Sequence, residues 1–455
     1  MLFVFGCKNN EIFSQSKLIS IPQRGPDTRL LYRNYREWEK ILPFQGLSVA
    51  FNPNKLNTLS SSGYFGKGTD ELCFSVFKPN KTINFRDYTN AINDLKKCNF
   101  KKFTNNFMII SIYDSNWSLW EDDKAWSRML ANLEAASKIA KESGLKGIIL
   151  DTETYGSPQN LNLTFYCQQF VNKTYVVNSK TAYIQISKAL DNHVIDDLFP
   201  KIKDKIYWKD SNNVANGIKL ENVHFDIYKD NKGNFYYPLL DPKYKNDIQV
   251  LLNKVELRGA QIISAISRHF ANADIMLTCG PSYVKDVLSD IQGLNSGNNY
   301  LRTGYGLLIP LTKGMLNSIV NTNCKLIDGQ EQTYYHKTRQ QFESSQRNFR
   351  AASSYFDDES KSIYLSNLEF AIGLYARPAL VNNNPRLFTE TEIRTTFKYV
   401  SSIAKVKYVW LYEENESYWY LESLKSRYLN KDVKVERIGV KDFRNHLKNI
   451  DLNNY

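Results

Sequence analysis

The sequence has few histidines and no paired cysteines. Its 455 residues include five histidines, at positions 193, 224, 269, 336 and 446, and none of them forms a pair. Metal-dependent amidohydrolase barrels need clustered histidine ligands, so this class is not expected. The six cysteines form no C-x-x-C pair, which excludes a zinc ribbon and gives no disulfide framework. Cys279 and Cys324 are expected to be buried free thiols.

Long apolar runs and glycine-rich nucleotide motifs are also missing. No run reaches the 18 or more apolar residues of a membrane-spanning helix, so a soluble chain is expected. No G-x-G-x-x-G opens a helix, and "GYFGKG" from Gly63 is too short, which disfavours a dinucleotide-binding fold. No Ser-His-Asp arrangement can be recognised, and His336 is interpreted as a polar rim residue rather than a base.

Basic residues exceed acidic ones, but they form no dense stripe. The 59 Lys and Arg against 47 Asp and Glu give a net charge of +12. The richest stretch, "KSRYLNKDVKVER" from Lys425, is interleaved with acids. A nucleic-acid partner is therefore not expected. A solvated basic surface and an anionic glycan partner both remain open.

The first ten residues, "MLFVFGCKNN", resemble the end of a bacterial lipoprotein signal, in which a cysteine after a small residue is acylated. Cys7 is the candidate for lipidation. The stretch departs from that pattern because it has no basic region and few apolar residues, so an ordinary frayed N-terminus is the alternative. The resemblance implies a location in the cell envelope, as an outer-membrane or periplasmic lipoprotein, or a secreted protein.

Short apolar runs alternate with helical patterns along the chain. In residues 122–144, Trp126, Met129 and Leu133 follow a helical spacing that begins at acids and ends at Gly144. Eight buried strands are predicted, beginning near residues 46, 107, 146, 274, 306, 324, 368 and 407. This alternation indicates an α/β protein with a (β/α)8 TIM barrel, and an open doubly wound sheet is the second choice.

One connection is too long for a plain barrel. About 120 residues separate the third and fourth predicted strands, and "TAYIQIS" and "VHFDIYKDNKGNFYYPL" within this stretch resemble strands. We therefore predict a long insertion after strand 3. The expected organisation is an N-terminal tether at 1–25, the first part of the barrel with strands 1–3 at 26–156, an inserted subdomain at 157–240, and the second part of the barrel with strands 4–8 at 241–455.

Carboxylates collect at the ends of three predicted strands. The third strand, "KGIILDTETYG", ends with Asp151 and Glu153, the sixth is followed by Glu331, and the eighth by Glu414. Functional groups of a barrel lie at the C-terminal ends of its strands, and side chains alternate along a strand. Asp151 and Glu153 therefore share a face, and all four acids are expected to surround one mouth.

A pair of carboxylates beside aromatic rings is what glycoside hydrolysis needs, because one acid protonates the leaving oxygen and the other acts as base or nucleophile. Glu153 and Glu331 are predicted to form this pair, with Asp151 and Glu414 tuning charge or binding sugar. The predicted substrate-binding residues are Tyr155, Trp117, Asp328, Tyr334, Trp410 and Tyr412. Neither cofactor nor metal is expected, although Asp151, Glu153 and Glu331 offer oxygen ligands to a divalent cation. Any single acid can also be structural.

Three segments resemble a family of uncharacterised, mostly secreted bacterial proteins regarded as glycoside-hydrolase-like TIM barrels. Its acidic motifs D-x-E-x-Y, D-G-x-E-x-x-Y and Y-V-W-x-Y-x-E are matched by "DTETY" from Asp151, "DGQEQTY" from Asp328 and "YVWLYEE" from Tyr408. The resemblance implies the barrel and a carbohydrate-active role, but no substrate. Well-known glycosidase barrels carry their catalytic Glu after strands four and seven, and by the present count these strands end in Thr-Cys-Gly and Tyr-Ala-Arg.

The sequence thus favours a surface-tethered or periplasmic glycoside hydrolase that acts on an oligo- or polysaccharide, with an anionic glycan as one of the open options. The membrane would be contacted only through the lipid. The first alternative is a non-catalytic glycan-binding surface lipoprotein, whose carboxylates only accept hydrogen bonds from sugar hydroxyls. The second is a structural or adhesion protein in which residues 157–240 form the partner surface.

Overall fold

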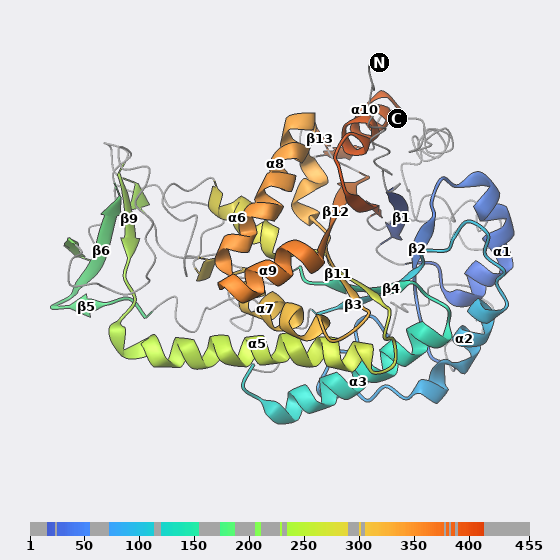
Figure 1. Cartoon of the computed structure of the whole chain (residues 1–455), viewed down its shortest axis with the longest axis horizontal. Coiled ribbons are helices and arrows are strands. Elements are labelled where there is room, and N and C mark those ends of the chain that lie inside the picture. The colour runs from blue at the N-terminus through green and yellow to red at the C-terminus, as the bar shows by residue number, and fades with distance from the viewer. Residues whose placement is uncertain are drawn as a thin grey trace, which may run out of the picture.

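A computed structural model describes residues 16–22, 25–54, 72–112, 120–153, 173–186, 205–210, 228–229, 234–289, 300–301, 305–376, 379–381, 384–386 and 390–413. Parallel strands in these ranges close into a barrel with the order β1-β15-β12-β11-β10-β4-β3-β2 (Figure 1). The strands are β1 (Lys17–Pro22), β2 (Gly46–Val49), β3 (Phe107–Ser111), β4 (Gly147–Asp151), β10 (Asp274–Leu277), β11 (Lys325–Asp328), β12 (Leu368–Tyr375) and β15 (Val406–Glu413). The predicted α/β class and the eight-stranded barrel are confirmed.

Helices surround the barrel and pack against it. They are α1 (Thr28–Ile41), α2 (Thr89–Lys96), α3 (Asp123–Glu142), α5 (Lys245–Ser267), α6 (Pro281–Ser289), α7 (Leu308–Ile319), α8 (Arg339–Ala351), α9 (Asp358–Asn367) and α10 (Glu390–Ser401). In α3, the side chain of Asp122 accepts the N–H of Ala125 as an N-cap. The helix is followed by Gly144 at φ +73°, a left-handed conformation that glycine adopts without steric cost. The helix predicted over 122–144 is confirmed.

Two strand predictions were wrong. The run at residues 306–311 is not a strand, because it leads into α7. That helix is apolar on nearly all sides and buried, so its sequence lacks the periodicity that separates a helix from a buried strand. Conversely, β1 was missed, because six residues ending in Pro22 lie in the stretch predicted to be a tether. The predicted count of eight was right only because these two errors compensate.

The missed strand changes the numbering of the others. With β1 included, "GIILD" at β4 is the fourth barrel strand in chain order, and the long connection follows the fourth strand rather than the third. Asp151 and Glu153 therefore stand after strand four, where the sequence-based count had placed Thr-Cys-Gly. The predicted departure from the well-known glycosidase arrangement at strand four is corrected accordingly.

The interior of the barrel is filled by alternate side chains of its strands. Together with Tyr334, which follows β11, they form one cluster of buried residues: Ile19, Ile21, Phe107, Ile149, Met276, Ile327, Ala371, Tyr408 and Trp410. At the N-terminal end, the buried carboxylate of Asp274 accepts a hydrogen bond of 2.5 Å from the hydroxyl of Tyr408. The amines of Lys407 and Lys146 lie 3.2 and 3.6 Å from the same carboxylate. This end is a closed floor, and the mouth lies at the other end.

The long connection after β4 carries a small antiparallel sheet. It comprises β5 (Val176–Val177), β6 (Lys180–Ile186), β7 (Ile206–Asp210), β8 (Tyr228–Lys229) and β9 (Phe235–Pro238), in the order β5-β6-β9-β8 with β7 also paired to β6. "TAYIQIS" and the pair β8–β9 are strands, as predicted. The sheet stands at the far end of α5, which runs from it along the barrel (Figure 1). Within the described ranges, no helix has the length and apolarity needed to cross a membrane.

Candidate active site

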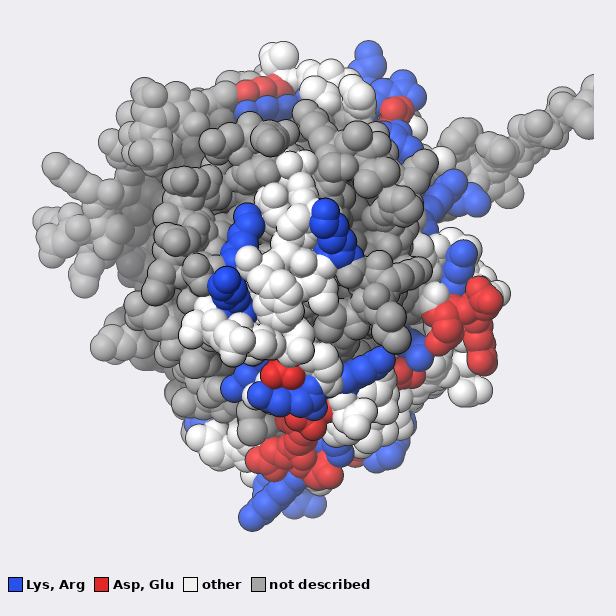
Figure 2. Space-filling view, turned by 90° about the vertical axis from the view of Figure 1, so that its left-hand side faces the viewer, with Lys and Arg blue, Asp and Glu red and all other residues white. Residues whose placement is uncertain are grey.

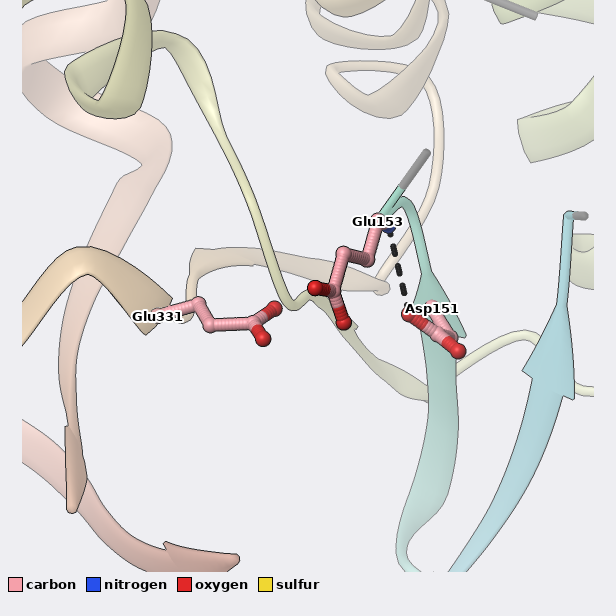
Figure 3. A group of neighbouring side chains, drawn as sticks. All are labelled: Asp151, Glu153 and Glu331. Atoms are coloured by element: carbon pink, nitrogen blue, oxygen red, sulfur yellow. Dashed lines mark hydrogen bonds between the residues drawn. The ribbon is translucent and has the colours of Figure 1, made fainter. Parts of the chain in front are cut away.

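Three carboxyl groups meet at the mouth of the barrel. Asp151 is the last residue of β4, Glu153 follows two residues later, and Glu331 opens the short 3-10 helix η4 (Glu331–Tyr335) after β11. One carboxyl oxygen of each residue lies within 4.8 Å of those of the other two. Glu153 lies between the other two acids, and its carboxyl group points towards that of Glu331 (Figure 3). The structure thus brings together three of the four acids that the sequence predicted for the mouth.

Strand alternation and one left-handed residue aim these side chains inward. Ile149 packs inside the barrel, so Asp151 and Glu153, at steps of two, continue along the same face. After β11, Gln330 adopts φ 59° and ψ 49°, and this left-handed turn starts η4 with Glu331 at its first position. Gly329 permits the turn to pass close to β10, because a Cβ there would lie 2.4 Å from the carbonyl oxygen of Leu277.

Asp151 is held by hydrogen bonds and in turn holds Glu153. Its Oδ1 accepts the backbone N–H of Glu153 at 3.2 Å and the hydroxyl of Thr278 at 3.3 Å. Burial raises the pKa of Asp151 to about 6, and the hydrogen bonds from Glu153, Thr278 and Ser111 oppose this rise. Asp151 therefore fixes the backbone of Glu153 and places a second carboxylate beside it.

Glu153 and Glu331 form a carboxyl–carboxyl pair, in which one side-chain oxygen of each lies within 4.8 Å of the other. Burial and the neighbouring charge of Asp151 raise the pKa of Glu153 to about 7. Burial and the charges of Glu153 and Asp151 raise the pKa of Glu331 well above its ordinary value. Because two carboxylates in contact resist ionising together, the pair retains one proton near neutral pH.

Thr278 and Cys279, which follow β10, each donate a side-chain hydrogen bond to one of the three acids. Thr278 donates to Asp151, and the Cys279 thiol donates to Oε2 of Glu331 at 3.4 Å. Thr152 fixes both residues, since its N–H donates to the hydroxyl of Thr278 and its own hydroxyl donates to the carbonyl of Cys279 at 2.6 Å. From the sequence, Cys279 was expected only to be a buried free thiol. The strand order β11-β10-β4, which places β10 between the two acidic strands, was the missing signal.

Three tyrosine rings stack beside the acids. The rings of Tyr334 and Tyr412 lie 5.7 Å apart at 6°, and Tyr375 lies 5.5 Å from Tyr334 and 5.8 Å from Tyr412. Tyr375 and Tyr412 are partly exposed, whereas Tyr334 is buried. Tyr375 was not predicted as a site residue, because no acidic residue follows it at the end of β12 in the sequence. Tyr283, at the start of α6, is also partly exposed, and its pKa is raised by burial and by the charges of Cys279, Glu331 and Glu153.

The structure places Trp410 inside the barrel beneath the tyrosines. It is 1% exposed, and its indole N–H donates to the carbonyl of Gly329 at 2.6 Å. Its ring fits because residue 373 is glycine, where a Cβ would lie 2.8 Å from that ring. Trp410 therefore packs beneath the tyrosine rings and does not expose a face on which a sugar could stack.

Asp328 is separated from the other acids by the alternation of β11. Its neighbour Ile327 faces the barrel interior, so Asp328 faces outward, is fully buried, and accepts the backbone N–H groups of Ser282 and Gln330 at 3.1 and 3.3 Å. It fixes two loops at the mouth. Burial raises the pKa of Asp328 to about 6. His336 is likewise removed from the acids, since its Nε2 lies 2.8 Å from the Ser345 hydroxyl and burial lowers its pKa to about 4.

Four predicted residues lie outside the described ranges. They are Glu414 and Tyr155, Trp117 and Cys7. Their predicted roles in charge tuning, sugar binding and lipidation, and the envelope location that depends on Cys7, stay predictions.

The buried acids predict how stability depends on pH. Because the folded protein holds protons on Asp151, Asp328 and Glu153 up to pH values of about 6 to 7, it binds more protons than the unfolded chain above about pH 4. The free energy of unfolding is therefore expected to decrease as pH rises from about 4 to about 7. Urea unfolding at pH 5 and 7.5 measures this, and higher stability at pH 7.5 would contradict it.

The chain matches no protein-family profile and no curated protein. Among solved structures it is similar to a GH18 chitinase from Pseudoalteromonas aurantia, with 11% identity and a TM-score of 0.34, covering 90% of this chain and 100% of that one. It is also similar to a β-mannanase from the blue mussel Mytilus edulis, with 9% identity and a TM-score of 0.34, covering 92% and 93%. At these TM-scores the likeness carries no weight for the site, which rests on its own geometry.

Proposed function

We propose that the chain is a glycoside hydrolase that acts on an oligo- or polysaccharide through Glu153 and Glu331. The close approach of their two carboxyl groups, both of which have a raised pKa, supports this proposal most directly. Glycoside hydrolysis needs one protonated carboxyl to give its proton to the glycosidic oxygen and one ionised carboxylate to attack or to activate water.

The surroundings of the pair suggest a role for each member. Glu331 is the more deeply buried of the two and has the more strongly raised pKa, so we assign it as the general acid. Glu153 ionises first and is fixed through its backbone by Asp151, so we assign it as the nucleophile. Tyr375 and Tyr412 offer partly exposed rings on which a sugar can stack.

The short separation favours a retaining reaction. Inverting enzymes keep their carboxyl groups roughly 6.5–9.5 Å apart so that a water fits, whereas retaining enzymes keep them about 5–5.5 Å apart. One carboxyl oxygen of Glu153 and one of Glu331 lie within 4.8 Å of each other, which is closer to the spacing of retaining enzymes. The first product is therefore expected to have the anomeric configuration of the substrate.

The proposal is tested by incubating the full chain with a panel of neutral and acidic polysaccharides and measuring released reducing ends. NMR of the first product then gives the anomeric configuration. Parallel reactions contain EDTA or added Ca²⁺, because three carboxyl oxygens this close also suit a divalent cation. Turnover that survives EDTA supports the carboxyl pair. Glycan binding without product after long incubation would favour the non-catalytic alternative.

A further inference from the structure

The small antiparallel sheet carries rings and ammonium groups that the proposed reaction does not use. Its described residues, 173–186, 205–210, 228–229 and 234–238, contain five lysines and one acid, Asp210. They also contain eight aromatic residues: Tyr175, Tyr183, Tyr207, Trp208, Tyr228, Phe235, Tyr236 and Tyr237. Aromatic faces and fixed cations together suit a polymer with flat, partly apolar units and negative charges.

The register of the sheet sorts these side chains onto two faces. One face carries Ala182 and Tyr237, which are fully buried, and Trp208, which is exposed; Tyr237 belongs to the main hydrophobic core of the protein. The opposite face carries Tyr183 opposite Tyr207 and Thr181 opposite Lys209. On this face Tyr183 and Tyr236 are buried, whereas Tyr207 and Lys209 are partly exposed and Lys205 is exposed. We call this second set, Tyr183, Tyr207, Tyr236, Lys205 and Lys209, the tyrosine–lysine face.

Rings and ammonium groups are interleaved on the tyrosine–lysine face. The rings of Tyr207 and Tyr236 meet edge to face at 5.9 Å. The Lys209 amine lies 3.5 Å from the ring centre of Tyr236, and the Lys205 amine lies 5.1 Å from that of Tyr207. These cation–π contacts hold flexible lysines in place, so less side-chain entropy is lost when an anion binds. From this side of the molecule, Lys and Arg side chains flank an uncharged strip (Figure 2).

Helix α5 places the sheet on the mouth side of the barrel. The helix has 23 residues, which corresponds to about 34 Å, whereas four-residue strands such as β10 span only about 13 Å. Its last turn leads to β10 at the floor, so its first turns extend past the mouth to the sheet (Figure 1). The helix is packed closely on α7, because a Cβ on Gly259 would lie 2.0 Å from the Leu311 carbonyl oxygen and one on Gly314 would lie 1.8 Å from that of Glu256.

We propose that the tyrosine–lysine face binds an acidic polysaccharide outside the mouth, and that this polymer is the substrate class of the barrel. The second part rests on the proposed function, whereas binding by the face does not. Charge complementarity supports an anionic occupant, since the face has two lysines and no acid and the whole chain has a net charge of +12.

The test measures binding of the full chain to polygalacturonate, which carries carboxylates, to chondroitin sulfate, which also carries sulfates, to neutral dextran, and to single-stranded oligo(dT). The double variant Lys205→Gln/Lys209→Gln is compared with Lys101→Gln/Lys325→Gln, which removes the same charge from exposed positions elsewhere. Binding of at least one acidic polysaccharide, weakened about tenfold or more only in the first variant, supports the proposal. Equal binding by both variants, binding of dextran as tight as that of the acidic polymers, or tightest binding to oligo(dT) would overturn it.

A second measurement separates this inference from the proposed function. On an acidic polymer that is cleaved, Lys205→Gln/Lys209→Gln is expected to lower kcat/KM about tenfold or more, while hydrolysis of a short oligosaccharide of the same sugar stays unchanged. Glu331→Gln is expected to keep full polymer binding without turnover. If only neutral polymers are cleaved while the face still binds acidic ones, the assignment of the substrate class is wrong and the binding face stands.

Discussion

Glu331→Gln is expected to lower kcat on a cleaved polysaccharide by about 10³-fold or more and to raise the melting temperature. Activity falls because glutamine cannot donate the proton that the glycosidic oxygen needs, and an essential acid contributes several kcal/mol to lowering the barrier. Stability rises because burial and the charges of Glu153 and Asp151 disfavour the ionised form of Glu331, and the neutral amide removes that cost.

The two effects are measured on the same preparation at pH 7.5, by steady-state turnover and by thermal unfolding. A stabilisation of about 1 kcal/mol corresponds to roughly 2–4 °C in a large domain. Glu153→Gln is expected to lose a similar share of turnover. Glu343→Gln is the control, because Glu343 is partly exposed on α8 and pairs with Arg339 one helical turn away, so neither quantity should change.

Two outcomes would contradict the assignment in different ways. Near-complete turnover in both Glu153→Gln and Glu331→Gln would show that this pair is not the catalytic one. Loss of turnover together with a lower melting temperature would indicate that Glu331 supports the fold, because replacing a side chain that stabilises the fold lowers the free energy of unfolding.

Trp410→Ala is expected to lower the free energy of unfolding by about 3–5 kcal/mol. Its ring is among the largest fully buried side chains, and the substitution leaves a cavity inside the barrel and an unpaired carbonyl at Gly329. Urea unfolding measures the loss. Trp208→Ala is the matched control, because Trp208 is 41% exposed and its removal is expected to cost about 1 kcal/mol or less. Unchanged stability with weakened sugar binding would instead restore the sugar-stacking role predicted from the sequence.

Local pattern was enough to predict the barrel and most of its strands. Runs such as "FMIIS" and "GIILD" are apolar on both faces, as strands of a parallel barrel require, and each is followed by polar residues. The meeting of Asp151, Glu153 and Glu331 followed from one rule, that the C-terminal ends of parallel strands share an edge. The strand predicted at residues 306–311 was wrong, because a helix buried on all sides and a buried strand have the same composition.

Which aromatic rings of the site are exposed could not be predicted from the sequence, because exposure depends on packing contacts between strands. Trp410 and Tyr412 share a face of β15, and only the packing of Trp410 against Gly373 and Gly329 buries one ring while the other remains partly exposed. The outward orientation of Asp328 was predictable, since a core residue at Ile327 places its neighbour on the other face. The hydrogen bond from Cys279 to Glu331 could be predicted only once the order of the strands in the barrel was known.

If the tyrosine–lysine face binds the substrate polymer, the length of α5 would let the protein distinguish long polysaccharides from short ones. A polymer that occupies both the mouth and the tyrosine–lysine face is held by two weak contacts joined through its own backbone, so the second contact forms at high effective concentration. An oligosaccharide that is too short to reach from the mouth to the tyrosine–lysine face makes only one of the two contacts. Because α5 is fixed to α7 at Gly259 and Gly314, the span between the two contacts is set by a rigid rod, and selection by chain length would be built into the scaffold.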